Sequence, residues 1–138
     1  MVFNSRISAS SPIGSSENLS YALMHRSLNK IADEVFNDDL YESTEERRPN
    51  TSVILEAALV LSQLPSEIDR AEIEPYSGEL SLVWRSGRTK RVKAMFGPGK
   101  KSFSVYHEQL VNGRVVEHHL RPQANDAYLR DRLAWLHT

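Results

Sequence analysis

The stretch Gly78–Phe96, "GELSLVWRSGRTKRVKAMF", decides the fold, because two strand patterns in it share one short connection. Apolar residues occupy every second position of both halves, namely Leu80, Leu82 and Trp84, then Val92, Ala94 and Phe96. This period of two is typical of strands with one buried face. Gly87 supplies the left-handed residue that such a connection commonly needs. The stretch therefore predicts an antiparallel hairpin with coinciding apolar faces and with Leu82 opposite Val92.

Further strand patterns lie on both sides of this hairpin. The segment "AEIEPY" reads as a short strand, and Pro75, which has no N–H to donate, places it at a sheet edge. Asn112-Gly113 separates "KSFSVYHEQLV" from "RVVEHHL" and is a strong signal for a two-residue hairpin turn. Such a turn pairs Val111 with Arg114. Counting back without interruption places His107 opposite His118, and it puts Val105, Val116 and Leu120 on one face and Glu108, Glu117 and His119 on the other.

Three segments have the pattern of helices. Residues 16–36 carry an apolar stripe at helical spacing, with Ser16 as the predicted N-cap. Residues 50–65 are apolar almost all round, which predicts deep burial between a cap at Asn50, Thr51 or Ser52 and a stop at Pro65. Residues 125–137 form a closing helix capped by Asn125 or Asp126.

The order of these segments predicts an α+β fold, with an antiparallel meander sheet of four or five strands and helices packed on one face. We divide the chain into a Ser-rich disordered tail (1–15), a helical arm with an acidic linker (16–48) and an α+β domain (49–138).

Composition limits the classes of protein that remain. There are no cysteines, which excludes a disulfide framework, a thiolate metal site and a cysteine nucleophile. The N-terminus has no apolar run of the kind that a secretory signal requires. No segment approaches the roughly 20 apolar residues that span a bilayer. We therefore expect a cytoplasmic protein without membrane association.

The charge is divided unevenly along the chain, although the formal net charge is only −1. Residues 31–79 hold thirteen acidic residues against three basic ones, whereas residues 80–107 hold seven basic residues and no acidic one. Those seven are Arg85, Arg88, Lys90, Arg91, Lys93, Lys100 and Lys101. Three interpretations of this basic group stay open: a solvated sheet face, a docking site for an acidic protein, or a contact with nucleic-acid phosphates.

The sequence contains parts of motifs for phosphate binding, metal binding and acid–base catalysis, and none of these motifs is complete. "GPGKK" (97–101) stands between two strands and lacks the Ser or Thr and the helix of a phosphate loop. His107 with His118 makes two metal ligands where zinc requires three or four. Glu108 and Glu117 would face each other as like charges, and no nucleophile motif accompanies them. The sequence therefore predicts no catalytic, metal or cofactor site.

The run Pro75–Arg91, "PYSGELSLVWRSGRTKR", resembles a pattern in small uncharacterised prokaryotic proteins. In these, an apolar helix precedes a Pro-containing strand, a Gly turn, a strand ending in Trp and a basic strand. The resemblance covers about residues 50–120. The proteins that share this pattern often look like products of mobile elements or of phage-defence or toxin–antitoxin cassettes. The resemblance implies the sheet and no defined activity.

The function that we expect is a non-enzymatic binding module that docks on an acidic protein through the seven basic residues, as an inhibitor, antitoxin or accessory subunit. The alternative is a nucleic-acid-binding protein that uses the same residues. The N-terminal helix, with its apolar stripe, could also join copies of the chain into a homo-oligomer.

Overall fold

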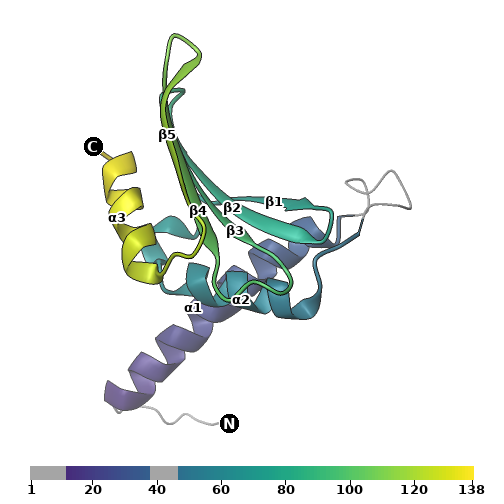
Figure 1. Ribbon diagram of the computed structural model, residues 1–138. Coiled ribbons are helices and arrows are strands. Elements are labelled where there is room, and N and C mark those ends of the chain that lie inside the picture. The colour runs from purple at the N-terminus through teal and green to yellow at the C-terminus, as the bar shows by residue number, and fades with distance from the viewer. Residues whose placement is uncertain (1–11, 38–46) are drawn as a thin grey trace.

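Five antiparallel strands form one sheet in the computed structural model, which describes residues 12–37 and 47–138 (Figure 1). Their order in the sheet is their order in the chain, so every neighbouring pair is joined by a hairpin connection. The elements are α1 (Pro12–Val35), α2 (Thr51–Ser62), η3 (Pro65–Glu67), β1 (Glu72–Tyr76), β2 (Glu79–Ser86), β3 (Lys90–Phe96), β4 (Ser104–Val111), β5 (Arg114–Arg121) and α3 (Asp126–Leu136). The predicted α+β meander is confirmed, with β1 at one edge.

The first helix begins earlier than the sequence predicts. Helix α1 starts at Pro12, so the predicted cap Ser16 lies inside it. A proline suits the first turn of a helix, because the N–H that it lacks would have no helical partner there. The rest of the predicted tail (residues 1–11) and most of the acidic linker (38–46) lie outside the described residues.

The second half of α1 packs against α2 and β1, and Ile31 and Val35 are fully buried there. Helix α2 lies between α1 and strands β2 and β3, which explains why it is apolar almost all round. Asn50 caps α2 by accepting a hydrogen bond from the Val53 N–H at 3.0 Å. No helix within the described ranges is long and apolar enough to cross a membrane.

The core lies on the side of the sheet that α2 and α3 cover, here called the helix side; the opposite side is called the outer side (Figure 1). Alternate residues of the central strands fill the helix side, namely Leu80, Leu82, Trp84, Val92, Ala94, Phe96 and Val105. Trp84 is 1% exposed, and its indole N–H donates to the Glu67 carbonyl at 3.1 Å. This bond fixes η3 against β2 and so connects the end of α2 to the sheet.

The first hairpin keeps the predicted faces but has a different register. Leu82 lies opposite Ala94, and Val92 lies opposite Trp84 instead of Leu82. The turn is centred one residue later than the prediction requires: pairing continues as far as Ser86 with Lys90, so residues 87–89 form the loop and Arg88 stands at its middle. Gly87 in this loop has φ of 57°, as the predicted left-handed residue requires.

The second hairpin has the predicted turn and an unpredicted bulge. Val111 pairs with Arg114 around Asn112-Gly113, as expected. The register then shifts, because Leu110 pairs with Val115 while Gln109 pairs with Glu117, which leaves Val116 as an extra residue. A β-bulge of this kind reverses the facing of all later positions.

The bulge overturns the predicted facing of the last strand. His107 lies opposite His119, not His118, and their ring centroids are 5.9 Å apart. Glu108 lies opposite His118 and does not face Glu117. Leu120 shares the outer side with Tyr106 and is 49% exposed, so it does not join Val105 in the core.

Helix α3 is held on the helix side by cations over its aromatic rings. Asn125 caps it, accepting from the Tyr128 N–H at 2.8 Å. The Arg121 guanidinium lies 4.7 Å from the Tyr128 ring centroid, and the Lys90 ammonium lies 5.0 Å from that of Trp135. Contacts of this type are worth about 0.5–1 kcal/mol at exposed sites and more when desolvated.

Replacing Trp84 should test its place in the core. We expect Trp84→Ala to lower the free energy of unfolding by about 3–5 kcal/mol, because it leaves a large cavity. Trp84→Phe should cost less, about 1–2 kcal/mol, since it keeps most of the apolar contact and loses the hydrogen bond. Urea denaturation measures both, with Tyr76→Ala as an exposed control. A Trp84→Ala variant as stable as the control would contradict this role.

Candidate functional site: the outer side of the sheet and the free edge of β5

The seven basic residues predicted as a contact surface are spread over three places. Arg85, Arg91 and Lys93 lie on the outer side of β2 and β3, and Lys90 turns to the helix side. Arg88 is exposed in the loop between β2 and β3, and Lys100 and Lys101 are exposed in the loop between β3 and β4. That second loop joins two strands, as the sequence analysis of "GPGKK" expects. The fold therefore does not gather the seven charges on one face.

Acidic residues of β1 accompany two of the outer-side cations. Arg85 contacts Glu72 at 3.1 Å and Glu74 at 3.4 Å, and Lys93 lies 3.8 Å from Glu74. Arg85, Glu72 and Glu74 are roughly half exposed and Lys93 is 24% exposed, so each pair contributes little to stability, about 0–1 kcal/mol. Their main effect is to cancel much of the positive potential on this part of the outer side.

The third outer-side cation belongs to a more buried cluster. The Arg91 guanidinium contacts the Glu108 carboxylate at 3.1 Å, and the Tyr106 hydroxyl donates to the same carboxylate at 2.8 Å. The Glu108 side chain is only 9% exposed. Burial raises the pKa of Tyr106, and the hydrogen bond to Glu108 raises it further, so the phenol remains protonated.

Lys90 has a structural role at the end of α3. Its ammonium donates to the carbonyls of Trp135 at 3.1 Å and Thr138 at 3.3 Å, and to the Thr138 hydroxyl at 2.7 Å. A cation is stabilised at a helix C-terminus by the exposed carbonyls and the helix dipole. Lys90 is therefore engaged within the chain.

The two edges of the sheet differ in their protection. Strand β1 has five residues, contains Pro75 and lies beside α1. Strand β5 has eight residues, and all of them are exposed. On its far side, no other described strand pairs with β5. Natural sheets usually protect long edges with charges, prolines, bulges or covering elements, and β5 relies on its charged residues and its bulge.

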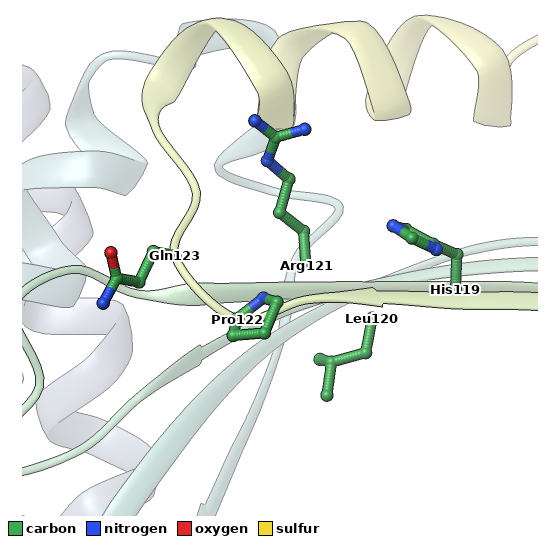
Figure 2. A pocket seen from close by; sticks show the side chains of 5 residues that line it. All are labelled: His119, Leu120, Arg121, Pro122 and Gln123. Atoms are coloured by element: carbon green, nitrogen blue, oxygen red, sulfur yellow. The ribbon is translucent and has the colours of Figure 1, made fainter.

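The free edge of β5 combines apolar and charged side chains. Val115, Val116 and Leu120 are 48–59% exposed. Arg114 and Arg121 stand at the two ends of the strand, and Glu117 is its one acidic residue. A hollow of about 470 Å³ follows the last part of the strand, lined by His119, Leu120, Arg121, Pro122 and Gln123 (Figure 2).

The free edge was not identified from the sequence, although a signal was there. The doublets Val115-Val116 and His118-His119 interrupt the alternation that a half-buried strand requires. Such an interruption is typical of a bulge or of a strand exposed on both faces.

The N-terminal helix offers a second apolar surface. Leu19 and Tyr21 on its first half are 62% and 75% exposed, whereas its second half packs within the chain. The predicted homo-oligomer through this helix stays a hypothesis.

Known proteins add no further guidance. Comparison of the chain with models of protein families, with curated proteins and with solved structures finds no match. Among the described residues, no group of three or more His, Asp or Glu side chains could hold a metal ion.

Two acidic residues of the outer side should differ sharply in importance. Glu108→Ala leaves the half-buried Arg91 without its partner, so we expect a loss of about 3 kcal/mol in the free energy of unfolding. Glu72→Ala breaks an exposed pair and should cost no more than about 1 kcal/mol. Chemical denaturation of both variants makes the comparison. Equal losses would show that the Arg91–Glu108 cluster is not buried as described.

His107 should make stability depend on pH. Burial lowers the pKa of His107 below its ordinary value of 6.5, and the nearby Arg132 lowers it further, while Glu117 opposes this. The unfolded state therefore binds more protons, so this part of the stability is complete above about pH 6.5 and is lost as pH falls through the folded pKa. We expect a smaller loss of unfolding free energy between pH 7.5 and 5.5 in His107→Phe than in wild type. An equally steep loss in the variant would be inconsistent with this origin.

Proposed function

We propose that the chain is a non-enzymatic protein-binding module that takes up an extended segment of a partner along the free edge of β5. The observation that carries this proposal is the edge itself: eight consecutive exposed residues with no strand beyond them in the described part of the sheet. In strand addition, backbone hydrogen bonds supply affinity and alternate side chains supply specificity.

The side chains of β5 favour a partner segment that is apolar and acidic. Leu120 and Val115 offer half-exposed apolar surface on the outer side of the hairpin. Arg114 and Arg121 outnumber Glu117, so acidic residues in the added strand would meet unlike charges at both ends. An acidic protein partner therefore remains the proposal, with its contacts centred on β5. Arg88 is exposed in the loop between β2 and β3 and adds positive charge near the end of the sheet where Arg114 lies.

The roles expected of such a module are those of an inhibitor, an antitoxin or an accessory subunit. Each of them acts by occupying a surface of another protein and requires no chemistry from the module. Support for this class comes from the neutralised outer side and the structural role of Lys90, which leave β5 as the more accessible contact.

Charge placed on the free edge should abolish partner binding. Lysine is a natural blocker of exposed edges, so Leu120→Lys should lose the partner while unfolding within about 0.5 kcal/mol of wild type. Tyr76→Lys, on the protected edge β1 and 76% exposed, is the matched control. Tagged chains are incubated with lysate of the source cells, with and without nuclease treatment, and bound proteins are quantified by mass spectrometry.

We expect one protein to be enriched by wild type and by Tyr76→Lys and depleted at least about tenfold with Leu120→Lys. On an array of synthetic peptides that covers the sequence of this protein, the tagged chain must bind an extended acidic segment. Retention of that protein by Leu120→Lys would refute strand addition on β5. Capture that disappears with nuclease treatment would instead favour nucleic acid and would also refute the proposal.

A further inference from the structure

The regular part of β5 is short and has its own symmetry. The bulge at Val116 interrupts pairing on one side, and Pro122, which has no N–H, ends it on the other. Between them lie five residues, Glu117 to Arg121, with His119 in the middle. Glu117 and Arg121 stand two residues before and two residues after His119, and they carry opposite charges.

We propose that this segment pairs with the same segment of a second copy, antiparallel and with the twofold axis at His119. In such a pair, residues whose numbers are equally far from His119 lie opposite each other. Glu117 of each copy then meets Arg121 of the other, so the two unlike pairs form at once. This inference deepens the proposed function, since it rests on the same edge and names one of its occupants.

The geometry of strands restricts which registers are allowed. Side chains and backbone N–H groups alternate in direction along a strand, so a symmetric antiparallel pair must be centred on a residue and not between two residues. A centre at Glu117 would place two carboxylates in contact, and a centre at Leu120 or beyond would extend the pair past Pro122. A centre at His118 would draw the bulged Val116 into the ladder. His119 is the centre that uses the regular segment alone.

The side chains of residues 119–121 alternate in direction as this pairing requires (Figure 2). His119 and Arg121 point to one side of the strand and Leu120 points to the other (Figure 2). On the helix side, the Glu117–Arg121 pairs would therefore flank the two His119 rings. On the outer side, Leu120, now 49% exposed, would be covered by His118 of the second copy. Helix α3 packs mainly on β2 and β3 and meets β5 through the Arg121 guanidinium over the Tyr128 ring, and all eight residues of β5 remain exposed.

Self-pairing gives the edge an occupant in the absence of another protein. A partner segment would have to displace the second copy, so the homodimer and the partner complex would exclude each other. The dimer would also protect the exposed edge from unspecific strand addition.

Charge reversal tests the register directly in the full-length chain. Glu117→Arg and Arg121→Glu each turn both unlike pairs into like pairs. Sedimentation velocity should show a dimer for wild type and a rise of at least about tenfold in the dimer dissociation constant for each variant. Mixing the two variants restores unlike pairs at both positions, so the mixture should form a heterodimer. Circular dichroism checks that both variants remain folded, because Arg121 also lies over Tyr128.

A single introduced cysteine locates the axis. The chain has no cysteine, so the cysteine of a His119→Cys variant can form a disulfide with the same residue of a second copy and with no other residue. Directly opposed Cα atoms in an antiparallel pair lie about 4.5–5.5 Å apart, within the range of about 4.4–6.8 Å that a disulfide spans. Val115→Cys is the matched control, since its two copies would lie more than about 20 Å apart. Oxidation should cross-link the first variant and leave the second monomeric under denaturing conditions.

Several results would overturn the inference. They are a wild type that stays monomeric at about 100 µM, a mixture of the reversed variants without heterodimers, or equal cross-linking at positions 115 and 119. A dimer that survives both reversals and is lost in Leu19→Lys would place self-association on α1 and would also overturn it.

A monomeric wild type that still loses its partner with Leu120→Lys would leave the proposed function intact. A His119-centred dimer in which Leu120→Lys still captures the partner would refute the proposed function alone.

Discussion

The bond from the Trp84 indole to the Glu67 carbonyl is the contact on which the arrangement of the other elements depends. It joins the residues that follow α2 to the centre of the sheet at 3.1 Å, in a site closed to water. The side chain of the same glutamate extends to His137 at the end of α3, with 2.8 Å between Oε2 and Nε2. One residue therefore links α2, the sheet and α3. Because the indole has a single donor, its position fixes η3 as well as filling the core.

Features that depend on near neighbours could be predicted from the sequence. Asn50 and Asn125 cap their helices through N–H groups three residues away, and Asn112-Gly113 makes its turn within four residues. Pro75 excludes β1 from the centre of a sheet by its own chemistry. In each case the physical cause lies inside the segment, so the pattern alone was sufficient.

Features that depend on how strands align could not be predicted in the same way. The hairpin between β2 and β3 turns one residue later than the predicted pairing of Leu82 with Val92 requires, and no local pattern states how far pairing continues. The bulge at Val116 carries no glycine to mark it. A single extra residue reverses every later side chain, so His119 and Leu120 exchanged sides relative to the prediction. Which side chains of β5 face the outer side, and therefore the candidate site, depends on that register.

The separation of charge along the sequence has a similar explanation. A meander places consecutive segments side by side, so the acidic half of the chain meets the basic centre where β1 joins β2. Glu74 lies between Arg85 and Lys93 for this reason. The sequence shows an excess of seven basic charges, but the sheet brings acids from a neighbouring strand to several of them. Charge alone therefore points to a partner less strongly once the neighbours in the sheet are known.

The bulge in β5 has opposite effects on the two parts of the strand. Bulges are a common protection of sheet edges, because the extra residue interrupts the row of N–H and C=O groups that another strand would join. Here the interruption at Val116 leaves Glu117 to Arg121 regular, and five residues form too short a ladder for permanent association by backbone bonds alone. Specificity must then come from side chains, and the one acidic residue of β5 stands where it can meet an arginine of a second copy. A weak pairing that depends on charge can be displaced by a partner with better-matched charges, which is the behaviour that a reversible binding module needs.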